Sequence, residues 1–195
     1  MGDKMNKEKI LTYITHIFFL GFFIIYLLQK NYEFIGYTLI TLLLFWLVIF
    51  IYKKYNLPFL VLFGFIVWVF LHMLGGIDFN GVRVYGIMLI NLIGAPLFIL
   101  RYDQVVHFYC YLIVGVILFY IVKKYVKKID AIMLFLIIVA SIGIGSLNEV
   151  VEFTMVLILG NTGVGDYFNT SLDIVANTLG AIVGVLVANY YTKKD

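Results

Sequence analysis

Two glutamates lie three residues apart in the apolar stretch SLNEVVEFTMV, which covers residues 146–156. Glu149 and Glu152 are the only acidic residues between positions 131 and 165, and this interval contains no Lys, Arg or His. An ionisable side chain at the centre of a membrane span costs roughly 2.5–3.5 kcal/mol on insertion scales, so such residues mark functional sites by default. We therefore expect the chemistry of this chain to take place around these two carboxylates.

Further polar residues occur in pairs at helical spacing. Asp103 and His107 are four residues apart, and so are Asp173 and Asn177, so each pair shares one helix face. Facing helices that carry carboxylates and an imidazole at such spacings build divalent metal sites. A bound ion there would activate water or polarise a phosphoryl or carbonyl oxygen. The candidate metal ligands are Asp103, His107, Glu149 and Asp173.

Two other interpretations of these residues remain open. Chains of Asp, Glu and His also carry protons or ions through transporters. Alternatively, the acids form a buried structural network that Arg83 and Arg101 neutralise. The relay is disfavoured because no ionisable residue lies deeper in the last three spans, and the isolated His16 does not supply one.

The composition indicates a polytopic membrane protein in one domain, residues 1–195. The chain is 64% hydrophobic and 13% charged, far from the balance of soluble domains. The expected fold is an all-α transmembrane helical bundle. Stretches of about 20 apolar residues predict six spans, placed near 10–29, 34–52, 57–74, 103–122, 131–151 and 171–191. The single cysteine, Cys110, excludes an internal disulfide and a cysteine-cluster metal site. No nucleic-acid partner is expected, because the lysines cluster between spans.

The basic residues predict the orientation. With six spans and both termini in the cytoplasm, 11 of the 14 basic residues lie inside and only Lys30, Arg83 and Arg101 lie outside, in agreement with the positive-inside rule. A seventh span at 82–100 would place four lysines of the 123–128 loop outside. We therefore interpret 82–100, an apolar stretch broken by Gly and Pro, as a re-entrant or interfacial segment on the outer side. It is a candidate wall or lid of a pocket.

This topology brings the polar residues of three consecutive spans to one depth on the outer side. The candidate catalytic residues are Asp103, His107, Glu149, Glu152 and Asp173, and the candidate ligand-binding residues are Asn177, Asp166, His72 and Arg101. A shallow outer pocket suits a lipid head group or a small extracellular molecule. The hypothesis is a membrane enzyme with a divalent metal cofactor. The alternative is a non-catalytic binding or transport protein that uses the same cluster. The oligomeric state is not indicated.

The C-terminal part of the chain resembles two membrane-protein families. The segments YDQVVHFYCYLIVG, SLNEVVEF and DYFNTSLDIVANTLGAIVG resemble VanZ-like proteins, which are associated with the cell envelope and glycopeptide-antibiotic resistance. The likeness to YjdF-type bacterial inner-membrane proteins of unknown function is closer and covers about 70–195. Its matching positions are His72 with Leu74-Gly75-Gly76, Tyr102-Asp103 with His107-Phe108, Glu149 with Glu152, Gly165-Asp166, and Asp173. The resemblance implies an integral membrane protein with an outward polar cluster. The chain departs from these patterns at Val106, Phe168-Asn169 and Glu152.

Overall fold

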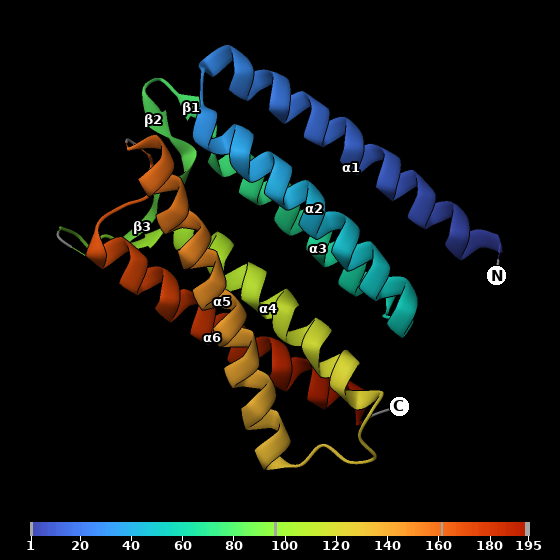
Figure 1. The fold of residues 1–195 in the computed structure, drawn as a ribbon. Helices are drawn as coiled ribbons and strands as arrows, with labels where there is room; N and C mark the ends of the chain where they lie inside the picture. The colour runs from blue at the N-terminus through green and yellow to red at the C-terminus, as the bar shows by residue number, and fades with distance from the viewer. Residues whose placement is uncertain (1, 96, 161, 194–195) are drawn as a thin grey trace.

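The chain folds into six apolar helices and a short strand segment (Figure 1). The computed structural model describes residues 2–95, 97–160 and 162–193. The helices are α1 (Gly2–Gln29), α2 (Tyr32–Tyr55), α3 (Phe59–Gly75), α4 (Tyr102–Lys123), α5 (Ala131–Leu159) and α6 (Tyr167–Thr192). All except α3 are long and apolar enough to cross a membrane, and α3 is an apolar helix of 17 residues. These helices confirm the predicted multi-pass helical bundle, while the count of six spans stays a prediction.

The helix boundaries follow from capping side chains and left-handed residues. Asn31, Asp130 and Asp166 accept hydrogen bonds from the first free backbone N–H groups of α2, α5 and α6. Asn56 and Gly160 take positive φ angles and end α2 and α5. Because Gly160 ends α5 two turns beyond the predicted boundary at 151, Glu149 and Glu152 lie inside the helix and not at its end.

The segment between α3 and α4 forms two antiparallel hairpins, which the all-α expectation did not include. β1 (Asp78–Phe79) pairs with β2 (Val82–Arg83), and β3 (Met88–Ile93) pairs with β4 (Ile99–Arg101). Asn80-Gly81 forms the first turn with φ angles of 52° and 80°, the conformation that the Asn-Gly pair adopts readily. A 3₁₀ turn, η1 (Val84–Gly86), joins the hairpins. The described part of 82–100 contains no α-helix, so a seventh helical span is absent there. Its position relative to a membrane stays a prediction.

Helices α4 and α6 pack backbone to backbone. A methyl group at Gly180 would collide with the Phe108 carbonyl, and one at Gly184 would collide with the Leu112 carbonyl. Ala181, one turn from Gly184, is fully buried. Small residues spaced four apart allow this close approach between membrane helices. The contact fixes the register of the two helices and sets the first turns of α4 beside the first turns of α6.

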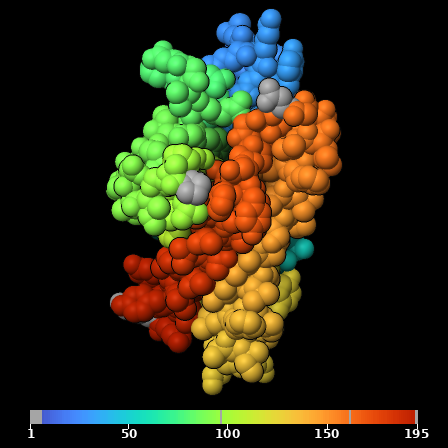
Figure 2. Space-filling model, turned by 90° about the vertical axis from the view of Figure 1, so that its left-hand side faces the viewer, coloured from blue at the N-terminus to red at the C-terminus, as the bar shows by residue number. Residues whose placement is uncertain are grey.

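The helices fall into two groups, α1–α3 and α4–α6, which lie close together at one end and diverge towards the other (Figure 1). We call the second end the lysine-rich end, because α1 begins and α2, α4 and α6 end there with Lys7, Lys9, Lys53, Lys54, Lys123, Lys124 and Lys193. The strand segment, drawn in green, lies at the first end beside the start of α6 (Figure 2). Where this segment meets α4, the hydroxyl of Tyr102 donates a hydrogen bond of 3.0 Å to the carbonyl oxygen of Leu71 on α3.

Candidate functional site

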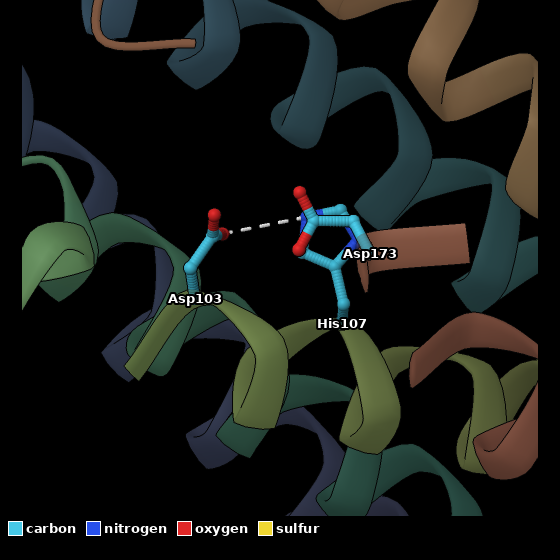
Figure 3. A group of neighbouring side chains, drawn as sticks. All are labelled: Asp103, His107 and Asp173. Atoms are coloured by element: carbon cyan, nitrogen blue, oxygen red, sulfur yellow. Dashed lines mark ion pairs between the residues drawn. The ribbon is translucent and has the colours of Figure 1, made fainter. Parts of the chain in front are cut away.

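His107 lies at the centre of a cluster of acidic side chains drawn from α4, α5 and α6. Its Nε2 atom is 3.5 Å from Asp103 Oδ1 and 3.6 Å from Glu152 Oε1. Its Nδ1 atom is 3.8 Å from Glu149 Oε1. Asp173 comes from α6 and faces the same imidazole (Figure 3). The structure thus brings together all five residues that were proposed as catalytic.

Asn177 defines which ring nitrogen of His107 carries the proton. The Nδ2 group of Asn177 donates to Glu149 Oε1 at 3.4 Å, so its amide oxygen points to the ring and lies 3.1 Å from His107 Nδ1. Only an Nδ1–H group can donate to that oxygen. The Nε2 atom then faces carboxylate oxygens of Asp103 and Glu152.

Asn169 holds two of the acids in place and was not among the predicted site residues. Its Oδ1 atom accepts a hydrogen bond of 3.1 Å from Arg101 Nη1, which leaves the NH₂ group to donate to Asp103 Oδ2 at 3.2 Å and Asp173 Oδ2 at 2.7 Å. The second oxygen of each carboxylate is left to face His107. The sequence does contain a signal for Asn169. It lies four residues before Asp173, which lies four residues before Asn177, so all three share one helix face.

Several oxygens of the cluster lack a protein partner. Glu149 Oε2 and Asp173 Oδ1 are buried without a hydrogen bond, and the Asp173 side chain is fully buried. Within the described residues, no Lys or Arg forms an ion pair with the four acids, because Arg83 pairs with Glu33 and Asp78 and Arg101 bonds to Asn169. Buried carboxylates without a cation or hydrogen-bond donor are strongly disfavoured. The amides of Asn148, Asn169 and Asn177 are instead the donors to the four acids, so a structural network stays an alternative interpretation.

Two overlapping sets of side chains have the spacing of a metal site. Asp103, His107 and Asp173 form one set, and His107, Glu149 and Glu152 form the other. Within each set, one ligand atom per residue lies within 4.8 Å of the others. Because His107 belongs to both sets, the cluster is one site with two possible groups of ligands and not two separate sites.

His72 and Tyr85 form the wall of the cluster on the side of α3. His72 Nδ1 and the Tyr85 hydroxyl share a hydrogen bond of 2.5 Å, and the His72 ring stacks on Trp68 with 5.2 Å between ring centroids. Burial, together with the charges of Asp103 and Glu152, raises the pKa of Tyr85 well above its ordinary value, so the phenol keeps its proton. His72 belongs to this wall and does not contact the acids directly. Tyr85 was not among the predicted site residues, because its position depends on the two hairpins.

Glu33 joins three elements beside the cluster, and no periodic pattern in the sequence predicts it. This buried carboxylate accepts hydrogen bonds from Arg83 Nη1 at 2.6 Å and from the backbone N–H of Gly163 at 2.7 Å. It thereby ties the start of α2 to the strand segment and to the loop between α5 and α6. Asp166, a proposed ligand-binding residue, is exposed and caps α6 through the N–H groups of Phe168 and Asn169.

The open space around the cluster has two parts. A cavity of about 40 Å³ lies between Tyr37, His72, Tyr85, His107 and Glu152, which is room for an ion or a few waters. A larger and mainly apolar groove of about 470 Å³ runs beside α5, lined by Phe153, Val156, Val164 and Tyr167. Glu152 lines both spaces, so it stands between the groove and the imidazole of His107.

The comparisons with known proteins agree with the membrane helices described above. Residues 10–194 match the family described as "Predicted membrane protein (DUF2238)". The comparisons found no matching curated protein and no matching solved structure. Since the match extends over almost the whole of this multi-helix chain, the protein belongs to this family of membrane proteins.

Proposed function

We propose that this protein is a membrane enzyme whose cluster binds one divalent metal ion and acts on the polar head group of a lipid or another envelope compound. The observation that carries the proposal is that His107 Nε2 lies 3.5 and 3.6 Å from oxygens of Asp103 and Glu152, while Asp173 Oδ1 in the same cluster is buried without a partner. Both distances exceed the 2.7–3.2 Å expected of a direct N–H···O hydrogen bond. A tetrahedral ion with bonds of about 2.0–2.2 Å would separate its ligand atoms by about 3.4 Å, which is close to the distances observed.

The ligand set that we favour is Asp103, His107 and Asp173, whose ligand atoms lie within 4.8 Å of one another. Asp173 belongs to it because its buried Oδ1 atom has no other partner. Glu149 and Glu152 form the other group with His107, and they accept hydrogen bonds from Asn177 at 3.4 Å and Asn148 at 2.8 Å respectively. A mixed imidazole and carboxylate set suits zinc, manganese or ferrous iron better than calcium or magnesium.

Each residue has a role in the proposed reaction. The bound ion would supply a Lewis acid and an activated water. Glu149, whose Oε2 atom is buried and unpartnered, would be the general base, and Asn177 orients the imidazole through Nδ1. Tyr85 remains a neutral donor at the opposite wall. The apolar groove beside Glu152 offers space for the substrate.

Elemental analysis of detergent-purified protein tests the proposal. We expect about one transition-metal ion per chain in the wild type and a loss of at least tenfold in Asp103→Asn and Asp173→Asn. The matched control is Asp166→Asn, because Asp166 lies on the same helix as Asp173 but caps it outside the cluster. Asn also caps helices well, so this variant should keep its metal. A wild type that contains no metal and takes up none from zinc, manganese or iron salts would overturn the proposal. If the metal is present, hydrolase and transferase assays on envelope lipids follow.

A second candidate function is the non-catalytic binding of a cationic ligand. It is favoured by the excess of four carboxylates over one imidazole in the cluster. Metal-free protein that binds a small organic cation and loses this binding in Glu152→Gln would support it. In either case we propose that the cluster faces away from the cytoplasm and accounts for the likeness to VanZ-like and YjdF-type proteins.

A further inference from the structure

A second cavity lies between α1 and α2 at the lysine-rich end, far from the polar cluster. Its volume is about 660 Å³, and Lys9, His16, Trp46 and Lys53 are among its lining residues. None of these residues lines the space around His107. The proposed reaction therefore makes no use of this cavity.

The cavity is polar at its mouth and aromatic at its floor. His16 lies seven residues beyond Lys9 on α1, and Trp46 lies seven residues before Lys53 on the antiparallel α2. Seven residues of helix rise about 10 Å, so both helices reach the same depth from the same end. The rings of His16 and Trp46 meet there, with centroids 5.3 Å apart. The cavity therefore has a cationic end near the helix termini and an apolar end about 10 Å deeper.

The two lysines at the mouth are not neutralised within the described residues. Neither Lys9 nor Lys53 forms an ion pair there, and both side chains are exposed. The cavity is lined by one acid, Glu8, so the two lysines leave it with an excess of positive charge. A ligand that complements this cavity carries a negative charge at one end and an apolar body behind it.

We propose that this cavity binds one anionic phospholipid, with its phosphate between Lys9 and Lys53 and an acyl chain against Trp46 and Ile49. A phospholipid fits because the charged end coincides with the ends of two membrane helices, where phosphate groups lie, and the apolar end points into the span. Basic pockets between membrane helices bind acidic lipid head groups in this manner. The site is independent of the metal cluster and of the reaction proposed there.

Quenching of Trp46 fluorescence by brominated lipids tests the site. The chain has two tryptophans, so Trp68→Phe leaves Trp46 as the only reporter. The protein is reconstituted in vesicles of phosphatidylcholine with increasing amounts of brominated phosphatidylglycerol, and separately of brominated phosphatidylcholine. We expect saturable quenching that prefers phosphatidylglycerol, and a fall in that preference of about fivefold for each of Lys9→Gln and Lys53→Gln.

Lys54→Gln is the matched control, because Lys54 is the neighbour of Lys53 but lies over the rings of Phe50 and Tyr55 outside the cavity. It should leave the preference unchanged. Equal quenching by the two lipids, or an equal loss in the control and in Lys53→Gln, would show that only general surface charge is involved and would overturn the proposal. Thermal unfolding in detergent serves as the folding check, since the Lys9, Lys53 and Lys54 variants should unfold at the same temperature as the Trp68→Phe parent.

Discussion

The Nδ1 atom of His107 lies 3.1 Å from the amide oxygen of Asn177, and both side chains are almost fully buried. The two residues come from α4 and α6 and are 70 positions apart in the chain. This contact orients the imidazole through Nδ1 and leaves Nε2 facing Asp103 and Glu152. The properties of the cluster therefore depend on a residue that need not touch a metal ion or a substrate.

We expect Asn177→Leu to weaken metal binding by about 10- to 100-fold, which is the usual effect of removing the partner that orients a histidine ligand. Asn177→Asp keeps an acceptor opposite Nδ1 and should retain most of the affinity. Titration of metal-stripped protein with zinc or manganese measures both values. Equal affinities for Asn177→Leu and wild type would exclude this role.

The ion pair of Glu33 and Arg83 should contribute to stability. Glu33→Gln leaves the Arg83 guanidinium without its closest acid, and we expect it to lower the free energy of unfolding by about 3 kcal/mol. Arg83→Gln should cost less, because Gly163 still donates to Glu33. Unfolding in detergent of the single variants and the double variant gives the coupling energy. A coupling energy near zero would show that the ion pair of Glu33 and Arg83 does not stabilise the fold.

The glycines of α6 should tolerate no side chain. Gly184→Val places methyl groups against the Leu112 carbonyl, and we expect a loss of about 3 kcal/mol or more through overpacking. Gly143→Ala is a suitable control, because a methyl group there meets nothing within 4 Å. Thermal unfolding in detergent compares the two. The same measurement on Gly180→Val should repeat the result of Gly184→Val.

The orientation can be tested by cysteine labelling in intact cells. In a Cys110→Ala background, Phe79→Cys on the first hairpin should react with a membrane-impermeant maleimide, since β1 is exposed at the cluster end. Tyr125→Cys, exposed at the lysine-rich end, should react only after the cells are opened. The reverse pattern would place the cluster in the cytoplasm and contradict the assignment from the positive-inside rule.

Helical periodicity predicted the part of the cluster that lies within single helices. Asp103 with His107 and Asp173 with Asn177 share faces because a helix repeats every 3.6 residues, and short loops made their helices neighbours. The contacts of Glu33 and Tyr85 could not be predicted in this way. Glu33 contacts Arg83 50 residues away and Gly163 130 residues away, and Tyr85 contacts His72 13 residues away. Arg83 and Tyr85 lie in the hairpin segment, which the all-α expectation did not include. The burial of Asn169 needed the close packing of α6 on α4.

The glycine contact between α4 and α6 divides the cluster into a fixed part and an adjustable part. Asp103, His107, Asp173 and Asn177 are carried by two helices whose backbones touch, so any sliding between them would meet hard repulsion. Helix α5 buries only Ile137, Ser141 and Gly145 among its 29 residues, and it supplies Glu149 and Glu152. The two glutamates therefore belong to the less tightly packed part of the cluster, and we expect a change in the position of α5 to alter the cluster more than any change in α4 or α6.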